Sequence, residues 1–361
     1  MESGTCKYFA LMEQLKENIL AGRIRPGDKL PSENVLANTY NISRHTVRKA
    51  LGILENEGYI AAEHGRGTFC CDRTRGSRPT KTVAVITTYI SDYIFPRLIQ
   101  GIYRVMTENG YSILLKNTGN SRSNEAKCLE DVMDKGIDGL IIEPSKSQIF
   151  CRHTHLYERL EASGIPYVFI QGCYPRMQDK PHILMDDCRG GYLLTKHLTG
   201  TGHRHIAGIF KADDSQGRER HKGYAMALQE AGLYYDPEYV IWFHTEDRKV
   251  KPAAMIRTML RTMPVDGVVC YNDQIALDVI RALTEDGIRV PEDISVTGYD
   301  NSAGARYGGV SLTTIAHPQE KLGEMAAELL LEKLGGIADA DSRVTRLIDP
   351  ELIVQNSTAA K

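Results

Sequence analysis

The sequence predicts an α/β protein with a small, mainly helical N-terminal domain and a larger body of parallel β-sheets. Three observations lead to this prediction. The chain has 361 residues, too many for one small core. Its first 71 residues carry helical hydrophobic periods followed by two short alternating runs. From residue 82 onward, β-branched runs alternate with amphipathic helical patterns, which is typical of parallel sheets covered on both faces.

Two helices open the N-terminal domain. Residues 7–21 place apolar side chains at mostly helical spacing. A stretch rich in Gly and Pro, residues 22–31, then interrupts the pattern. Ser32 and Glu33 begin a second predicted helix, residues 32–40, because a serine at this position can cap the free amides of the first turn.

A third helix and a hairpin follow. Residues 43–54 place an apolar stripe on one side of a helix that Ser43 caps; the stripe is Val47, Ala50, Leu51 and Leu54. Residues 59–71 alternate around Gly65 and Gly67, which predicts two short strands joined by a tight loop. Helix, helix, turn, helix and hairpin together make a winged helix-turn-helix.

Basic and imidazole side chains cover the opposite flank of the third helix: Arg44, His45, Arg48 and Lys49. On an isolated helix such a flank is most simply a solvated surface. In a winged helix-turn-helix it enters the major groove, where arginine can form a paired hydrogen bond to guanine. Arg44 and Arg48 lie one turn apart on the same face and suit base edges, whereas Lys7, Lys49 and Arg66 suit phosphates.

Three segments carry a family resemblance: LPSENVLANTY, SRHTVRKAL and GRGTFC. They resemble the GntR-type winged-helix domain over roughly residues 7–71, although the usual threonine after the first arginine is His45 here. The resemblance implies DNA binding. Together with the side-chain chemistry, it gives the expected DNA contacts: Lys7, Glu33, Ser43, Arg44, His45, Thr46, Arg48, Lys49, His64, Gly65, Arg66 and Gly67.

Composition and charge agree with a DNA-binding head on a globular body. Apolar residues make up 42% of the chain and charged residues 25%. Residues 1–81 hold 13 Lys or Arg and 9 Asp or Glu, a net charge of +4, and the remainder carries −6. This asymmetry suggests that only the N-terminal domain approaches a polyanion.

The same composition indicates the compartment. The sequence shows neither an eighteen-residue apolar run nor the basic-then-apolar pattern of a secretory signal, so we expect a cytoplasmic protein without a membrane partner. The eight cysteines show no CxxC pair and no disulfide-framework spacing, which predicts buried or half-buried thiols.

The predicted domains are residues 1–71, a linker over residues 72–81, and a body over residues 82–361. The linker is basic and polar and contains Gly and Pro, although an ordinary surface loop would look similar. Eight strands are predicted in the body: TVAVITT, YSILLK, DGLIIE, PYVFI, HIAGIF, YVIWF, DGVVC and ISVTGY. So many strands exceed one compact lobe and fit two lobes of similar size.

Polar side chains directly after these strands are candidate ligand contacts, because ligands of parallel sheets bind beyond the carboxyl ends of the strands. They are Thr88, Asp92, Tyr93, Glu143, Lys146, Gln171, Asp213, Asp214, Asn272 and Asp300. Arg220 lies in the helix that follows Asp214. Set among aromatic rings, such groups can hold a polyhydroxyl ligand. Singly, each is equally consistent with a loop or a helix cap, and Asn272 is a candidate N-cap.

The body also carries a resemblance, in GHRHIAGI, RERHKGY, CYNDQIALDVIRAL, VPEDISVTGYDN and LTTIAHPQEKLGEMAAELLLEKL. These segments resemble the LacI/GalR-type effector domain, which is similar to periplasmic sugar-binding proteins, over nearly all of residues 81–356. By position, the resemblance implies effector contacts at Gln171, Arg220, Asn272, Asp300 and His317, and after the first strand at Thr88 and Tyr93. We add Asp92 and Glu143 from the strand ends.

A GntR-type head on such a body, with TTYISDYIFP, IIEPSKS and GIFKADDSQG, resembles the arabinose-responsive repressors. This implies operator DNA as partner and L-arabinose as effector, with no other cofactor; the residues alone indicate only a small polyol. We expect a homodimer, because one winged helix contacts too few base pairs for useful specificity. The rival interpretations are a repressor answering another sugar, a sugar-transport protein and a sugar-processing enzyme.

Metal and catalytic motifs favour neither a metal site nor an enzyme. His153 with His155 and His203 with His205 are spaced as pairs, but the sequence supplies no third ligand, so we expect surface or capping histidines. No GxSxG elbow or P-loop follows a strand. The acidic pairs at 186–187 and 213–214 lack a neighbouring nucleophile, and we expect them to cap helices.

Overall fold

The computed structural model describes residues 7–20, 23–25, 27–56, 58–63, 66–71, 79–91, 93–302, 304–335 and 345–361. These residues form two compact units, one of residues 1–80 with 159–165 and one of residues 81–158 and 166–361. Most of the predicted linker, residues 72–78, lies outside the described residues. Within the described part of the chain, no helix is both long and apolar enough to cross a membrane.

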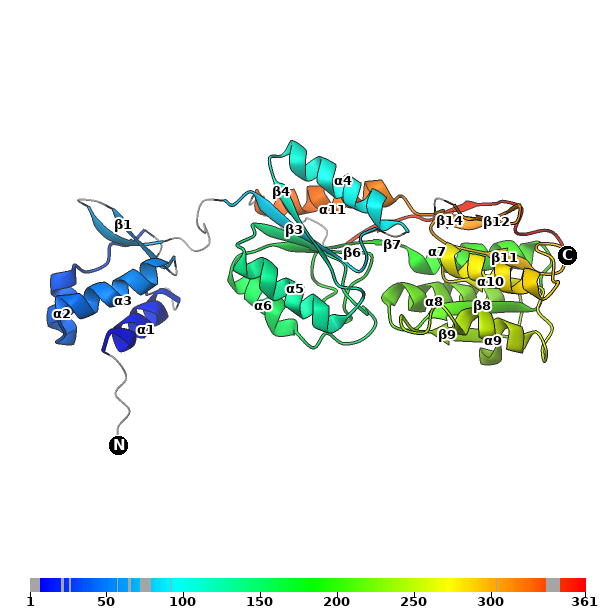
Figure 1. Cartoon of the computed structure of the whole chain (residues 1–361), viewed down its shortest axis with the longest axis horizontal. Helices are drawn as coiled ribbons and strands as arrows, with labels where there is room; N and C mark the ends of the chain where they lie inside the picture. The colour runs from blue at the N-terminus through cyan, green and yellow to red at the C-terminus, as the bar shows by residue number, and fades with distance from the viewer. Residues whose placement is uncertain are drawn as a thin grey trace, which may run out of the picture. The chain divides into compact units, whose positions relative to one another are not determined.

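The N-terminal unit is a winged helix-turn-helix, as predicted (Figure 1). Its elements are α1 (Lys7–Leu20), α2 (Glu33–Tyr40), α3 (Arg44–Asn56) and the antiparallel pair β1 (Ile60–Glu63) and β2 (Gly67–Cys70). Ser32 and Ser43 accept hydrogen bonds from the amides of Val35 and Thr46, so both serines cap their helices. Asn41 ends α2 with a left-handed φ of 49°.

The core of this unit contains the predicted apolar stripe of α3. Val47, Ala50 and Leu54 are fully buried and Leu51 nearly so. They form one cluster with Leu11, Met12 and Leu15 of α1. Packing of this stripe turns the basic flank of α3 outward, which fixes the face available to a partner.

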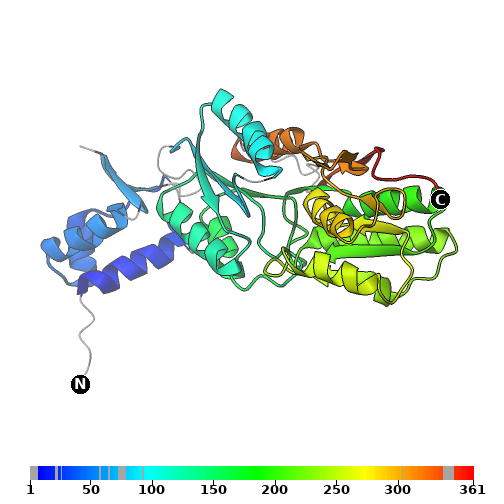
Figure 2. The ribbon, with the colours of Figure 1, turned by 45° about the vertical axis from the view of Figure 1, so that its right-hand side comes forward.

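The body consists of two lobes, each built on a parallel sheet. The first lobe has strand order β15-β7-β6-β5-β3-β4. Its strands are β3 (Thr82–Thr87), β4 (Ser112–Asn117), β5 (Gly139–Ile142), β6 (Tyr167–Ile170), β7 (His182–Met185) and β15 (Thr345–Ile348). Helices α4 (Phe95–Glu108) and α11 (Gln319–Leu334) cover one face, and α5 (Arg122–Asp134) and α6 (Thr154–Ala162) the other (Figures 1 and 2).

Two glycines allow α4 and α11 to approach closely. A Cβ atom on Gly101 would lie 2.1 Å from the carbonyl oxygen of Glu320, and one on Gly323 would lie 2.2 Å from that of Leu98. The helices could not keep this contact with any larger residue at either position.

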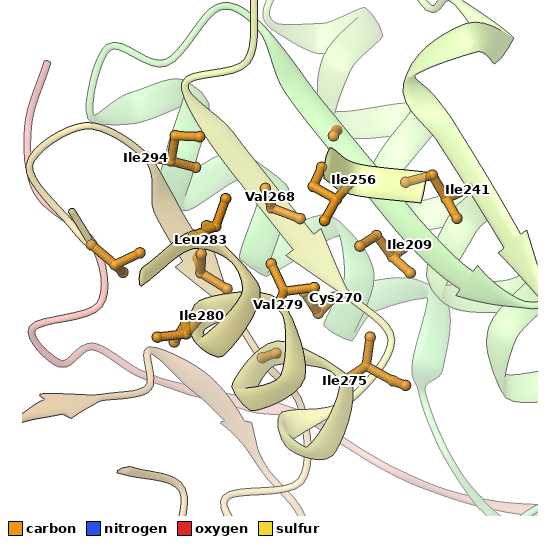
Figure 3. Packing of buried hydrophobic residues seen from close by; sticks show 14 of the residues in the cluster. Ile209, Ile241, Ile256, Val268, Cys270, Ile275, Val279, Ile280, Leu283 and Ile294 are labelled. Carbon is orange, nitrogen blue, oxygen red and sulfur yellow. The ribbon is translucent and has the colours of Figure 1, made fainter. Parts of the chain in front are cut away.

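The second lobe has strand order β11-β10-β8-β9. Its strands are β8 (Ile206–Lys211), β9 (Val240–Phe243), β10 (Gly267–Cys270) and β11 (Ser295–Thr297). Helices α7 (Asp187–Gly200) and α8 (Ser215–Glu230) pack on one face, and α9 (Lys251–Met259) and α10 (Asp273–Glu285) on the other. Figure 3 shows the second core, where Ile275, Val279 and Leu283 of α10 lie against Val268 and Cys270 of β10.

The chain passes between the lobes three times: from β7 to α7, from β14 (Thr314–Ala316) to α11, and from β15 to β16 (Glu351–Ile353). β14 and β16 pair antiparallel, and a further hairpin joins β12 (Arg306–Tyr307) to β13 (Val310–Ser311). All eight predicted strands are present. The sequence analysis missed β7, β15 and these short antiparallel strands.

Candidate functional site

A cavity of about 110 Å³ lies between the two lobes of the body. One buried water needs roughly 10–15 Å³ by this measure, so the space suits about seven to eleven waters or one small polar molecule. Eight of the nine predicted ligand residues line it: Thr88, Tyr93, Glu143, Gln171, Arg220, Asn272, Asp300 and His317. The ninth, Asp92, lies outside the described residues.

The cavity forms where the predicted strands end. Thr88, Glu143 and Gln171 directly follow β3, β5 and β6 of the first lobe. Lys211 and Tyr271 occupy the corresponding ends of β8 and β10 in the second lobe. The two sheets therefore present their carboxyl ends to one space, as expected for a ligand site of parallel sheets.

Arg220 is the most constrained charge in the site. It is 5% exposed, and its Nε donates to Asp187 Oδ1 at 2.8 Å. Its Nη1 donates to the carbonyl oxygen of Tyr271 at 2.6 Å, and its Nη2 lies 3.8 Å from Asp300 Oδ1. The guanidinium also lies over the ring of Tyr299, 3.5 Å from the centroid. These contacts fix the guanidinium and neutralise its charge within the protein.

A second cluster of charges surrounds Lys211. Its Nζ lies 3.1 Å from Asp214 Oδ2 and 3.8 Å from Asp213 Oδ1. Burial opposes the charged form, but these carboxylates raise the pKa of Lys211 above its ordinary value, so it stays an ammonium. Asp214 Oδ2 also accepts from the hydroxyl of Tyr271 at 2.6 Å, which ties the cluster to the wall of the cavity.

Glu143 and Thr88 form a hydrogen-bonded pair on the first lobe. The amide and hydroxyl of Thr88 donate to Glu143 Oε2 at 2.7 and 2.6 Å. Burial raises the pKa of Glu143 to about 7, although these two hydrogen bonds lower it. The side chain can therefore gain or lose a proton near neutral pH.

His317 and Gln171 provide neutral polar groups. His317 Nε2 lies 3.0 Å from Gln171 Oε1, so Nε2 carries the proton and Nδ1 is an acceptor. Burial lowers the pKa of His317 to about 4, which keeps the ring neutral at pH 7. Nδ1 is buried and has no hydrogen-bond partner among the described residues, so it could accept from a ligand hydroxyl.

The arrangement fits a neutral polyhydroxyl ligand. Arg220 and Lys211 already face carboxylates of the protein, so neither is available to balance a phosphate or a sugar acid. The lining also contains neutral donors and acceptors, the rings of Tyr89, Phe243 and Tyr271, and Arg248, whose guanidinium lies 5.0 Å from the centroid of the Tyr89 ring. Hydroxyl groups match such a mixture, and aromatic faces match the C–H faces of a small ring.

Sequence reasoning missed several lining residues: Tyr89, Asn120, Ser147, Lys211, Phe243, Arg248 and Tyr271. Lys211 and Tyr271 carry the same strand-end signal as the predicted residues and could have been found. Asp214 was noted at a strand end but not assigned to the site. Lys146, noted likewise, lines a different cavity, where its Nζ is 2.5 Å from Glu246 Oε1.

The helix caps expected at acidic and amide residues are present. Asp186, Asp214 and Asn272 accept hydrogen bonds from the amides of Arg189, Gly217 and Ile275. Asn272 thus caps α10 with its Oδ1, and its Nδ2 is the group that could donate to a ligand. Asp187 and Asp213 depart from the expectation, because the carboxylate of Asp187 binds Arg220 and that of Asp213 accepts from the amide and hydroxyl of Thr245.

The histidine pairs are only partly as expected. His155 and His205 are exposed, as expected of surface histidines, whereas His153 and His203 are buried. The expectation of a surface or capping histidine is therefore wrong for His153. His153 Nε2 lies 2.9 Å from the buried carboxylate of Glu125, whereas His203 Nδ1 meets the carbonyl of Leu198 near the end of α7 and does act as a cap. Across the described ranges, His, Cys, Asp and Glu side chains form no group of three or more that could hold a metal.

The candidate DNA surface is the outer flank of α3. Arg44, His45 and Lys49 are exposed, as are Lys7, Arg66 and Gly67. Arg48 is exposed but already paired: its Nε and Nη2 donate to Glu33 Oε1 and Oε2 at 3.1 and 2.8 Å. The predicted wing residues His64 and Gly65 lie outside the described residues.

Two family models match the chain. The model of the gntR family of bacterial regulatory proteins matches residues 7–70, and that of a periplasmic binding protein-like domain matches residues 195–358. A solved LacI family transcriptional regulator from Enterococcus faecium, with bound ribose, is 27% identical and superposes with a TM-score of 0.65. That alignment covers 78% of this chain and 99% of the regulator.

Two curated relatives extend the similarity to the whole chain, and each is named an arabinose metabolism transcriptional repressor. The relative from Halalkalibacterium halodurans is 42% identical over 98% of this chain and 96% of its own length. The relative from Geobacillus stearothermophilus is 39% identical over 98% of this chain and 97% of its own length. Both are transcriptional regulators, which confirms the prediction against an enzyme. The chain belongs to the family of arabinose metabolism transcriptional repressors.

Proposed function

We propose that the protein is a cytoplasmic repressor that binds a two-fold related operator as a homodimer and is released by L-arabinose. The observation that carries this proposal is the convergence of eight predicted polar and aromatic residues on one interlobe cavity, in a chain that also bears a winged helix. The named function of the two relatives supports arabinose as the effector.

On the DNA side, the exposed flank of α3 enters the major groove. Arg44 at the start of the helix and Arg48 one turn later address neighbouring base pairs, and Lys7, Lys49 and Arg66 contact phosphates. A dimer is proposed because two half-sites one helical turn apart supply the base contacts that one head lacks.

On the effector side, the sugar binds between the lobes and stabilises the closed arrangement, in which hydrogen bonds join the two lobes. Asn120 Nδ2 donates to Thr245 Oγ1 at 2.7 Å and Ser147 Oγ lies 3.1 Å from Ser215 Oγ, so residues of the two lobes already meet beside the cavity. Release requires that the sugar bind the DNA-incompetent state more tightly than the competent one. A coupling of about 1–3 kcal/mol, or roughly 5–150-fold in affinity, is typical.

The test measures operator binding by the full chain with and without sugars. Fluorescence anisotropy of a labelled duplex from the promoter region upstream of arabinose-utilisation genes gives the affinity, and calorimetry gives sugar binding. L-Arabinose should weaken operator binding by roughly 5–150-fold, and D-arabinose is the matched control because it has identical composition and opposite handedness. Operator affinity that no aldose changes would overturn the proposal. A response to D-ribose or D-xylose alone would replace the effector and keep the repressor.

A further inference from the structure

Tyr93 holds an unusual place between the two lobes. It follows β3 of the first lobe and has a φ of 64°, in the left-handed region that a bulky residue seldom adopts. Its ring packs against the apolar cluster of the first lobe that includes Ile94 and Phe95. Non-glycine residues keep such a conformation only where the surroundings enforce it, and these positions concentrate at functional sites.

The hydroxyl of Tyr93 makes its hydrogen bonds to the second lobe. It lies 2.6 Å from Asp300 Oδ2 and 3.0 Å from the carbonyl oxygen of Tyr299. With one proton to donate, it favours the closer, charged acceptor. It also accepts, at 3.2 Å, from the amide of Asp273, the first residue of α10, which donates as well to the carbonyl oxygen of Tyr299 at 2.9 Å. The proton and one lone pair of the hydroxyl are therefore engaged by protein groups.

Asp300 connects this contact to the ligand site. Its carboxylate lies 3.8 Å from Arg220 through Oδ1, while Oδ2 accepts from Tyr93. Asp300 is 4% exposed, and its φ of 99° shows that it too is held in a constrained conformation. The Tyr93 hydroxyl thus fixes the direction of a carboxylate in the cavity wall and joins the first lobe to the beginning of α10.

We propose that Tyr93 is a positioning residue that fastens the lobes together, rather than a residue that binds a sugar hydroxyl. This role differs from the effector contact that the family resemblance implies for Tyr93. The proposal rests on the proposed function, because it assumes that the cavity binds an aldose. Sugar binding and lobe bridging then share one hydrogen bond. Loss of the hydroxyl weakens every sugar equally, because the missing bond joins two protein groups.

The experiment compares Tyr93→Phe with Tyr234→Phe, a matched control at a side chain that is 88% exposed. Calorimetry measures the affinity of the full chain for L-arabinose and for each of its monodeoxy derivatives. Tyr93→Phe should weaken binding roughly ten- to a hundredfold, the range for a lost hydrogen bond to a charged group. The factor should be the same for the parent sugar and every deoxy derivative, and Tyr234→Phe should match the wild type.

A direct sugar contact predicts a different pattern. The loss would then disappear for the one deoxy sugar that lacks the partner hydroxyl, and that result would overturn the proposal. Unchanged L-arabinose affinity in Tyr93→Phe would overturn it as well.

A second measurement needs no sugar. Amide hydrogen exchange at the first turn of α10, around Asp273, should be faster in Tyr93→Phe than in the wild type and Tyr234→Phe. Equal exchange in all three proteins would also refute the proposal. If the wild type binds no aldose, the proposed function fails, while the exchange result still decides the role of Tyr93.

Discussion

Replacement of Arg220 by alanine should damage the stability of the body as well as its response to sugar. The side chain is almost fully buried and donates to Asp187 at 2.8 Å. Its removal leaves Asp187 and Asp300 without their cation in an enclosed site. Breaking one side of a buried ion pair costs about 3–5 kcal/mol. That is a large part of the roughly 5–15 kcal/mol by which domains are stable.

Thermal unfolding makes this loss measurable. For domains of this size, 1 kcal/mol shifts the midpoint by about 2–4 °C, so Arg220→Ala should lower it by roughly 6–20 °C. Arg218→Ala is the matched control, because Arg218 lies on the same helix, is half exposed and, among the described residues, pairs with its neighbour Glu219 alone. Its midpoint should stay close to that of the wild type.

The pH dependence separates electrostatics from lost packing. Burial raises the pKa of Asp187 to about 6 from an ordinary value of 3.8, even though Arg220 lowers it. Without the arginine the pKa of folded Asp187 rises further. Between the ordinary pKa of 3.8 and this raised pKa, Asp187 is protonated in the folded state and ionised in the unfolded state. Stability of the variant therefore falls as pH rises through this window, and its deficit should be larger at about pH 8 than at about pH 5.

A double variant, Arg220→Met with Asp187→Asn, removes both charges of the pair and should recover much of the stability that Arg220→Ala loses. A midpoint for Arg220→Ala within about 2 °C of Arg218→Ala would refute the reasoning. Equal stability deficits of Arg220→Ala at the two pH values would show that the loss comes from packing and not from a buried carboxylate left without its cation.

Three further outcomes are expected. Arg44→Ala should weaken operator binding by about 1–3 kcal/mol and relax preference at one base pair, measured by competition with single-base variants of the operator; an equal loss at every position would instead assign a phosphate contact. Glu33 holds the guanidinium of Arg48 in place, so Glu33→Gln should lower affinity for the operator; because it also removes a negative charge, it should raise affinity for random duplex. A parallel change on both duplexes would show that Glu33 does not position Arg48. Sugar affinity of the wild type should decline as pH falls through about 7, because the carboxyl of Glu143 is protonated there and stops accepting from ligand hydroxyls. Glu143→Gln has no group to protonate and should show no such decline, which calorimetry on either side of that pH checks.

Local patterns were enough to predict most of the fold. The stripe from Val47 to Leu54 and the caps at Ser32 and Ser43 depend on spacing within a few residues, and all are present. β7 was missed because only one of its four residues, Ile183, is β-branched, so His182–Met185 lacks the composition typical of a strand. The pairing of β15 and β16 depends on partners distant in the sequence: Thr345 pairs with His182, 163 residues away, and Ile353 pairs with Thr314, 39 residues away.

The ligand site could be predicted to the level of strand ends and no further. Strand ends converge in every parallel sheet, so Thr88, Glu143 and Gln171 could be found without coordinates. The pairing of Arg220 with Asp187 could not, because it depends on how closely α7 packs against α8. A Cβ atom on Gly191 would lie 2.1 Å from the carbonyl oxygen of Arg220, so the absence of a side chain there sets the approach. Similarly, the contact of Glu33 with Arg48 could not be predicted, because it depends on the angle at which α2 crosses α3.

The three passages of the chain between the lobes affect the order in which the protein can be made. β15 and β16 complete the edge of the first lobe and the antiparallel pair of the second, so neither lobe is whole until residues 345–353 are synthesised. The winged helix needs only residues 7–71 and can fold on the emerging chain. At typical translation rates the 282 residues from 72 to 353 take roughly 14–56 s to follow. Every new molecule therefore passes through a stage with a finished winged helix and no ligand cavity, which ends only after β15 and β16 have been made.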